Sequence, residues 1–246
     1  YKELEKKVDH SAGLRLNGAL SIAETKGRWQ ELQRQATTAQ LYDVDVRILD
    51  KDQIKKDYPI VNTDNVIGGI LMPGDGAADP SGVTHMLAKA ARQEGAQIFE
   101  KSPVEEIITK DGKISGVKVK GQIIECEYIV LASGMWSRQI GEKAGVSIPL
   151  YPAEHFYIIT EPIENLSKTL PVIRDFDNRT YIKEDAGKIL VGIFEGNSIP
   201  AWDKTNKVPE DFSFGEFQEN FEHFEPYLAS AIKRFPVLET AGIRKF

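Results

Sequence analysis

The sequence contains a single cysteine, Cys126, among its 246 residues. One thiol excludes an internal disulfide and a cysteine-rich zinc site, and it fits a reducing compartment. The chain also lacks any cluster of five or six Lys or Arg residues, and its formal net charge is −6. Because binding to nucleic acid or to an anionic membrane needs a basic face, we expect neither as a partner.

Long apolar runs are missing as well. No run approaches the roughly 18 to 20 apolar residues that a membrane-spanning helix requires, so no membrane span is expected. The sequence has no GxGxxG motif after a first strand, the loop that usually holds a dinucleotide pyrophosphate. It begins without Met, and Leu4 and Val8 are spaced as in a helix already under way. We therefore expect a central fragment of a longer protein, without the phosphate-binding loop.

The residues that are present can bury a sizeable core, because 41% are hydrophobic and 9% are aromatic. Alternation over residues 14–23 around Asn17 and Gly18 predicts a β-hairpin. Asp50 and Gln53 form a capping-box pattern that predicts a short helix. The same periodicities predict helices over 28–42, 81–94, 214–224 and 226–235, and strands over 44–48, 66–72, 97–99, 104–108, 114–119, 123–125, 154–160, 181–183 and 189–195.

A continuous apolar run over residues 128–132 predicts a strand buried on both faces. The strand is expected to end at Ser133 and Gly134, with a helix from about Trp136. Small residues at a strand's end let the backbone approach a ligand closely, and ligands bind at that edge of α/β sheets. Trp136 would then lie against a ring system. A tight packing turn followed by a core Trp explains the same pattern.

His155 and Tyr157 are two residues apart on a predicted strand, so their side chains are expected to share one face. They could present an imidazole and a phenol to one cavity, or they could be satisfied structural residues. Arg174 could clamp a substrate carboxylate, and a surface ion pair with the adjacent Asp175 is the alternative.

Several segments, taken in this order, resemble the D-amino-acid-oxidase-like flavoproteins, in particular the sarcosine and dimethylglycine dehydrogenase branch. The resemblance covers nearly the whole chain. The matching segments are GILMPGDGAADP (69–80), Pro103-Val104, YIVLASGMW (128–136), EHFYIIT (154–160) and LPVIRD (170–175).

The resemblance implies an α/β (α+β) fold, with part of an FAD-binding Rossmann-like domain plus a mixed, largely antiparallel substrate-domain sheet and flanking helices. Residues 1–80 and 148–246 would supply substrate-domain elements. Residues 81–147 would be part of the FAD-binding domain, with a helix and strands ending at Gly134. The family's phosphate loop would precede this chain, and its glycine-rich flavin-closing segment would follow it.

The resemblance also implies an enzyme in which FAD takes a hydride from a small secondary or tertiary amine such as sarcosine or dimethylglycine. Val104 would contact the adenosine part through its backbone. Ala132, Ser133, Gly134 and Trp136 would line the approach to the flavin.

The family's HxY pair falls on His155 and Tyr157, which would face the substrate. Where some dimethylglycine enzymes carry two adjacent tyrosines, this chain has Thr180 and Tyr181, which leaves the exact amine open and makes Tyr181 a third candidate catalytic residue. An imidazole titrates near neutrality, so it suits an acceptor for the proton of the amine. Arg174 stays the candidate for binding the substrate.

Three segments also resemble the regulatory subunit of pyruvate dehydrogenase phosphatase: EHFY (154–157), HFEPYL (223–228) and FPVLET (235–240). The alternative function is therefore a non-catalytic interaction subunit with the same fold. We expect a location in the cytoplasm if the protein is bacterial and in the mitochondrial matrix if it is eukaryotic. The sequence leaves open the electron acceptor, the mode of FAD attachment and the oligomeric state.

Overall fold

The structure is a computed structural model that describes residues 1–205 and 207–246. Contacts within the chain group the residues into two compact units. The first unit joins residues 1–94, 155–196 and 218–246, and the second unit joins residues 95–154 and 197–217. The functional division with boundaries near residues 80 and 147 stays a prediction.

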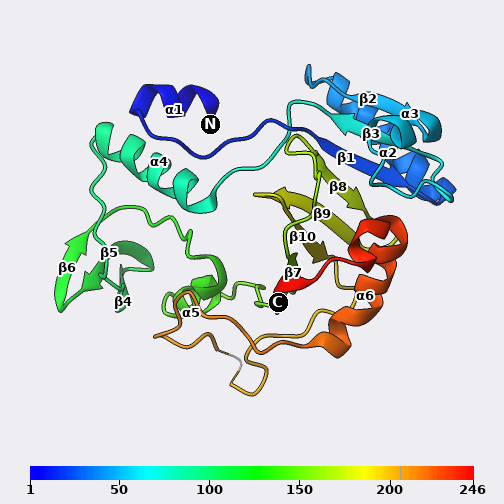
Figure 1. Ribbon diagram of the computed structural model, residues 1–246. Helices are drawn as coiled ribbons and strands as arrows, with labels where there is room; N and C mark the ends of the chain where they lie inside the picture. Colours follow the sequence, from blue (N-terminus) through cyan, green and yellow to red (C-terminus); the bar gives the residue numbers. More distant parts are fainter. Residues whose placement is uncertain (206) are drawn as a thin grey trace. The chain divides into compact units, whose positions relative to one another are not determined.

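The first unit is built on an eight-stranded sheet (Figure 1). Its strands are β1 (Ala19–Ala23), β2 (Arg47–Asp50), β3 (Gly68–Met72), β7 (Tyr157–Thr160), β8 (Val172–Asp175), β9 (Thr180–Asp185), β10 (Lys188–Ile193) and β11 (Ile243–Lys245). They lie in the order β11-β7-β10-β9-β8-β1-β3-β2. The β1–β8 pair is parallel, and the other neighbouring pairs of this sheet are antiparallel. This arrangement confirms the mixed, largely antiparallel sheet expected from the sequence.

The hairpin predicted over residues 14–23 is wrong. Arg15 forms an isolated bridge with Ala77, while β1 pairs with β3 on one side and with β8 on the other. All five residues of β1 are buried, so this strand needs a neighbour on each side, and a two-stranded hairpin would leave one edge unpaired. Gly18 has a φ of 86°, the positive value that the predicted turn required. A strand follows this turn, namely β1, but no strand within residues 1–17 precedes it to complete a hairpin.

Helix α2 (Lys26–Gln40) and the next helix along the chain cover the end of the sheet formed by β3 and β2. Helix α2 buries Leu32 and Ala36 against Ala23 and Ile70. This packing explains the helical spacing of apolar residues seen in the sequence, because α2 presents one apolar face to the sheet.

Helix α3 (Lys51–Asp57) begins with the capping box predicted from the sequence. The Asp50 side chain accepts the backbone N–H of Gln53 at 2.8 Å, and the Gln53 side chain accepts the backbone N–H of Asp50 at 2.9 Å. Two N–H groups that the helix itself cannot satisfy are thereby paired.

Helix α6 (Phe221–Arg234) packs against β9 and β10. Its Phe224 and Ala231 are fully buried. Figure 1 shows α6 beside these strands, so one face of the sheet is covered by a helix and carries much of the core of the first unit.

The helix predicted over residues 214–224 is wrong in its first part. Phe214 and Phe217 lie outside α6, which begins after Asn220. The Asn220 side chain accepts the backbone N–H of His223 at 3.0 Å, and this N-cap sets the start of the helix. Pro226 lies inside α6 and does not begin a second helix.

Helices α1 (Lys2–Val8) and α4 (Pro80–Gln93) pack against each other through Val8, Ala12 and Met86. The strand expected after α4, over residues 97–99, does not form, and these residues are exposed. The strand, helix and strand predicted over residues 66–72, 81–94 and 97–99 therefore do not make a βαβ unit. Strand β3 is instead antiparallel to both of its neighbours, so no parallel crossover follows it.

The second unit contains a three-stranded antiparallel sheet. Its strands are β4 (Glu106–Lys110), β5 (Lys113–Val119) and β6 (Gln122–Glu125), in the order β4-β5-β6. This sheet confirms the three strands that the sequence predicted over residues 104–108, 114–119 and 123–125.

The buried strand predicted over residues 128–132 is wrong for this structure. The segment forms no strand, and Tyr128 and Val130 are 85% and 89% exposed. A strand buried on both faces needs hydrogen-bonded neighbours and a layer over each face. The three strands of the second unit pair with one another and supply no such neighbour. The segment leads instead into a short 3₁₀ helix (Gly134–Trp136) and helix α5 (Ser137–Glu142).

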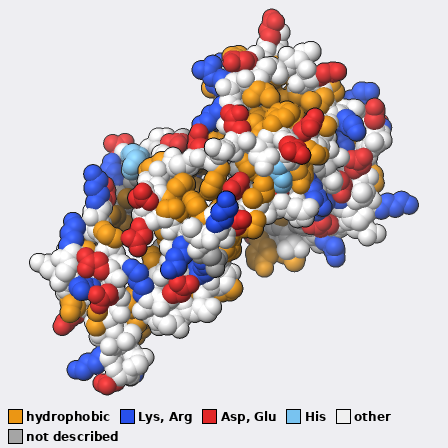
Figure 2. Space-filling view, turned by 90° about the horizontal axis from the view of Figure 1, so that it is seen from below, with side chains coloured by type: hydrophobic (Ala, Val, Ile, Leu, Met, Phe, Trp, Pro, Cys, Tyr) orange, Lys and Arg blue, Asp and Glu red, His pale blue; other side chains and the backbone are white. Residues whose placement is uncertain are grey.

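No helix within the described residues is both long and apolar enough to cross a bilayer. On the face shown in Figure 2, acidic and basic side chains are interspersed, with hydrophobic patches between them. This mixture agrees with a sequence that has no cluster of basic residues.

A buried network of charged and polar side chains in the first unit surrounds Arg234, the last residue of α6. Its Nε donates to Asp175 at 2.7 Å, its Nη2 donates to Glu24 at 3.1 Å, and its Nη1 donates to the carbonyl oxygen of Asn62. The side chains of Arg234 and Asp175 are 6% and 0% exposed. Asn178 donates to Glu24 at 2.6 Å and to Asp175 at 2.8 Å. One guanidinium thus ties together α6 and the ends of β1 and β8.

Replacing Arg234 by Met should lower the free energy of unfolding by about 3–5 kcal/mol, because the fully buried Asp175 would lose its countercharge. Urea denaturation followed by circular dichroism measures this loss. Lys7→Met is the control, because its ion pair with Glu94 is 64% and 69% exposed, is screened by solvent and should contribute little. Equal effects of the two substitutions would contradict a structural role for the buried network.

Candidate functional site

Three candidate residues lie in one row across the sheet of the first unit. Arg174 on β8 is paired with Tyr181 on β9, Tyr181 is paired with Gly192 on β10, and Gly192 is paired with Tyr157 on β7. Directly opposed residues on neighbouring strands project to the same face. The strand order therefore brings Arg174, Tyr181 and Tyr157 to one face of the sheet.

Gly192 makes room for a phenol at the centre of this row. A Cβ on Gly192 would overlap the Cζ and hydroxyl oxygen of Tyr181. The ring of Tyr181 therefore lies directly over the backbone of β10. Burial raises the pKa of Tyr181, and the charges of Glu195 and Tyr157 raise it further. The phenol of Tyr181 is thus a neutral hydrogen-bond donor at physiological pH.

Other aromatic rings hold Tyr181 in place. Phe194 lies 5.2 Å from Tyr181 between ring centroids, and Phe176 stacks on Phe194 at 5.0 Å. The guanidinium of Arg28 lies 5.2 Å from the centroid of Phe176. Such contacts restrict ring motion and give the row a fixed aromatic wall.

His155 lies next to this row but outside β7, which begins at Tyr157. Strand alternation therefore does not fix its direction, contrary to the simple reading of two residues on one strand. Its Nδ1 lies 2.6 Å from Oε2 of Glu195, and Oε1 of the same carboxylate accepts the backbone N–H of Phe156 at 3.1 Å. The Glu195 side chain is 2% exposed, whereas that of His155 is 50% exposed. The imidazole is anchored by a buried acid and is open to solvent on its remaining surface.

Arg174 does not pair with its neighbour in the sequence. Its Nη2 lies 3.5 Å from Oδ2 of Asp75, and both side chains are about one-third exposed. Asp175 is buried and is bound by Arg234. Consecutive strand residues face opposite sides of a sheet, so the ion pair between Arg174 and Asp175 that the sequence suggested cannot form.

The five candidate cofactor contacts, Val104, Ala132, Ser133, Gly134 and Trp136, lie in the second unit. Gly134 has a φ of 54° and begins the 3₁₀ helix, and the backbone N–H of Trp136 donates to the carbonyl of Ser133 at 3.2 Å. Ala132 and Gly134 are exposed, while Trp136 is half-buried. The tight turn predicted at this junction is present, although the strand expected before it is not.

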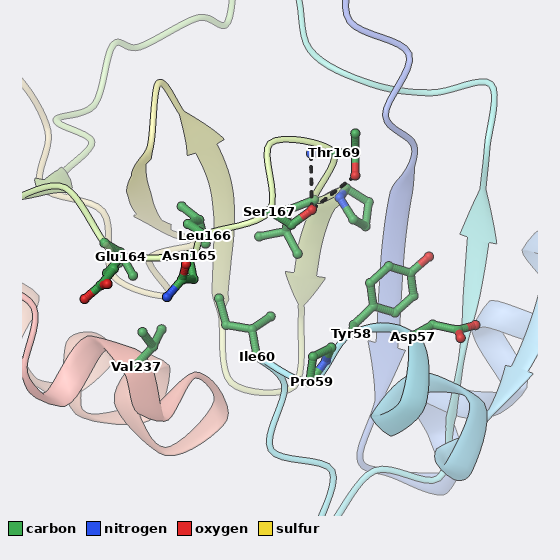
Figure 3. Close-up of a pocket in the computed structure, with 13 residues that line it drawn as sticks. Asp57, Tyr58, Pro59, Ile60, Glu164, Asn165, Leu166, Ser167, Thr169 and Val237 are labelled. Atoms are coloured by element: carbon green, nitrogen blue, oxygen red, sulfur yellow. Dashed lines mark hydrogen bonds between the residues drawn. The ribbon is translucent and has the colours of Figure 1, made fainter.

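A cavity of about 380 Å³ lies elsewhere in the first unit, and it contains none of the candidate residues (Figure 3). Residues 57–60 form one side, the loop over residues 163–171 forms the other, and Val237 closes one end. Ile60, Leu166 and Val237 give it a largely apolar lining. The cavity lies at the start of β8, and neither Arg174 nor the two tyrosines of the row line it.

A family model described as "DAO: FAD dependent oxidoreductase" matches residues 1–245. The chain belongs to this FAD-dependent oxidoreductase family. This match confirms the family resemblance expected from the sequence. It also confirms FAD as the cofactor, because the family is FAD-dependent.

Named relatives of this DAO-family chain include both enzymes and a regulatory protein. Over all of its length it is 35% identical to the 4-methylaminobutanoate oxidase (formaldehyde-forming) of Paenarthrobacter nicotinovorans, of which it covers 30%. It is 34% identical to the mitochondrial sarcosine dehydrogenase of Homo sapiens, covering 99% of this chain and 26% of that protein. It is 33% identical to the mitochondrial pyruvate dehydrogenase phosphatase regulatory subunit of Mus musculus, covering 100% of this chain and 28% of that protein. The chain thus spans less than a third of each relative.

Solved structures show the same fold. The L-proline dehydrogenase of P. horikoshii superposes with a TM-score of 0.82 at 24% identity, covering 99% of this chain and 62% of that one. The glycine oxidase of Bacillus cereus superposes with a TM-score of 0.71 at 22% identity, with the same two coverages. These similarities confirm the mixed α/β fold class.

The residues of this DAO-family chain fit part of FAD. At Gly134 nothing lies within 4 Å of where a Cβ would be, so a ligand can approach its backbone closely. The carbonyl oxygen of Val104 accepts from Nζ of Lys143 at 3.1 Å, which fixes the backbone there. No GxGxxG sequence exists among the 246 residues to hold the pyrophosphate. Contacts of Val104 and Gly134 with FAD stay a prediction, with which the open backbone at Gly134 is compatible.

Three residues of the candidate site were not predicted from the sequence: Gly192, Glu195 and Asp75. Gly192 carried a signal, because it interrupts an apolar strand, and a glycine there often marks a close approach to the backbone. Glu195 and Asp75 carried none, since each meets its partner only through the strand order of the sheet.

Replacing Gly192 by Ala should lower the free energy of unfolding by about 1–3 kcal/mol, because the new methyl group must displace the ring of Tyr181. The loss should largely disappear in a background of Tyr181→Ala, and urea denaturation of the four proteins measures this coupling. Gly27→Ala in α2 meets no neighbouring atom and should be neutral or stabilising. Additive effects of Gly192→Ala and Tyr181→Ala would show that Gly192 does not make room for the ring.

Proposed function

We propose that this chain is the substrate-facing part of an FAD-dependent enzyme that oxidises the C–N bond of a small secondary or tertiary amino acid such as sarcosine or dimethylglycine. The observation that supports this proposal is the row of Arg174, Tyr181 and Tyr157 beside His155, in a chain of the FAD-dependent oxidoreductase family. The names of two relatives, a 4-methylaminobutanoate oxidase and a sarcosine dehydrogenase, point to an N-methylated amine.

Bound FAD would supply the hydride acceptor for this reaction. An ammonium group has no lone pair to stabilise the iminium ion that forms as hydride leaves, so the amine must first lose a proton. His155 would accept that proton, because an imidazole can change charge between pH 5 and 8. Its ring is half exposed and held by Glu195, so it can meet a substrate in a fixed orientation.

The tyrosines and Arg174 would position the substrate. Tyr181 and Tyr157 would offer their ring faces to the methylated nitrogen, since cations are attracted to aromatic faces. Arg174 would bind the carboxylate, as planar guanidinium groups do. The contact of 3.5 Å with Asp75 must loosen when a carboxylate binds, so Asp75 would reduce the net gain from binding the carboxylate.

Replacing His155 by Gln should lower the rate of flavin reduction by an N-methyl amino acid about 10²-fold or more, the usual loss on removing a general base. Anaerobic stopped-flow spectroscopy measures that rate in a flavin-loaded longer protein that includes a GxGxxG loop, and the spectrum of the bound flavin should change little. His85→Gln is the matched control, because His85 is an exposed residue of α4 and should leave the rate unchanged. A normal rate in the His155 variant would place the base elsewhere.

The 246-residue chain alone should not bind FAD tightly, because its contacts do not include a loop for the pyrophosphate. Titration of FAD followed by flavin fluorescence tests this expectation, with a longer protein that includes a GxGxxG loop as the positive control. Stoichiometric binding to the chain alone would contradict it.

A non-catalytic regulatory subunit is the second candidate function. The 33% identity to the pyruvate dehydrogenase phosphatase regulatory subunit favours it, and that identity is close to those of the enzymes. Flavin reduction separates the two functions. If no N-methyl amino acid reduces the flavin and the protein instead binds a phosphatase, the regulatory function holds.

A further inference from the structure

We propose that Glu195 is a positioning residue that holds the hydrogen of His155 on Nδ1 and leaves Nε2 as the proton acceptor. The catalytic part of this inference rests on the proposed function, whereas the position of the hydrogen follows from the structure alone. Glu195 would act through His155 and would not itself contact the substrate.

The hydrogen bonds of Glu195 decide which ring nitrogen carries the hydrogen. Its Oε1 accepts the backbone N–H of Phe156 at 3.1 Å, and its Oε2 lies 2.6 Å from Nδ1 of His155. An ionised carboxylate only accepts hydrogen bonds, so Nδ1 must be the donor. In a neutral imidazole the other nitrogen, Nε2, then has a free lone pair.

The same pairing of strands that builds the row also places Glu195. Gly192 on β10 is paired with Tyr157 on β7, so the residues after Gly192 run beside those before Tyr157. Strand β7 begins at Tyr157 and β10 ends at Ile193, so no ladder hydrogen bonds of these strands orient His155. The Glu195 carboxylate replaces them, because it binds both the ring of His155 and the next backbone N–H.

Glu195 also separates the roles of His155 and Tyr181. After burial, the charge of Glu195 is the next largest cause of the raised pKa of Tyr181. The carboxylate that disfavours a tyrosinate also engages Nδ1 of His155 at 2.6 Å. Glu195 thus keeps Tyr181 as a phenol while it holds the ring of His155.

Glu195→Gln tests the inference through the tautomer of His155. With its amide oxygen on the N–H of Phe156, the glutamine would point its NH₂ at Nδ1 and force the hydrogen onto Nε2. Two-bond ¹H–¹⁵N spectra of ¹⁵N-histidine-labelled flavin-loaded protein, recorded where imidazole is neutral, report which nitrogen carries the hydrogen. We expect Nδ1–H in the wild type and Nε2–H in the variant. The same nitrogen protonated in both would overturn the proposal.

The rate of flavin reduction by sarcosine or dimethylglycine provides the second measurement. Glu195→Gln should lower it at least about tenfold, and should lower it no further in a His155→Gln background, because the two residues act as one unit. Glu184→Gln is the matched control. Glu184 is also a buried acid of this sheet, bound to a backbone N–H (Gly187, 2.8 Å) and a cation (Arg15, 2.6 Å).

Glu184→Gln should lower stability, leave the tautomer of His155 unchanged and combine additively with His155→Gln. If Glu195→Gln behaves in the same way, Glu195 is merely structural and the proposal is wrong. If the tautomer switches but sarcosine and dimethylglycine leave the wild-type flavin oxidised, the proposed function fails while the positioning of His155 by Glu195 holds.

Discussion

The buried contact between Arg234 and Asp175 is the constraint on which the candidate site depends. Asp175 follows Arg174 on β8, and the two side chains must face opposite sides of the sheet. By binding Asp175 at 2.7 Å, Arg234 of α6 fixes one side and so directs Arg174 to the other. Removing two charges from water is costly, and the bonds to Glu24 and Asn178 offset part of that cost.

Local patterns in the sequence were enough for some elements. The capping box of α3 and the neighbouring strands β9 and β10 are formed by residues close together in the chain, and the capping box and both strands were predicted. The run over residues 128–132 has an equally clear local pattern, yet it is exposed, because burial of a strand depends on neighbours that its own residues do not specify. The spacing of apolar residues indicates which face of a strand or helix could be buried. It does not indicate which other element covers that face.

The candidate site was predictable in its residues and not in its geometry. His155, Tyr157 and Arg174 were proposed from their spacing and chemistry, and Tyr181 was proposed through the family resemblance. Only the strand order shows that three of the four form one row. Adjacency in sequence was misleading for Arg174, whose partner is Asp75 from the turn after β3. Glu195 lies 40 residues from His155, and no motif links two residues at that separation.

The pairing of charges in the first unit bears on what the site can hold. Asp75 faces Arg174 and Glu195 faces His155, while Asp175 is engaged with Arg234 on the opposite face. In the proposed function, the end of the row at Arg174 would suit an anionic group. The other end, near His155 and Glu195, would suit a group that loses a proton. Under the same proposed function, a small amino acid would present one of each, separated by one carbon. A simple amine lacks the anionic group, so it would make no use of Arg174, which would keep Asp75 as its partner.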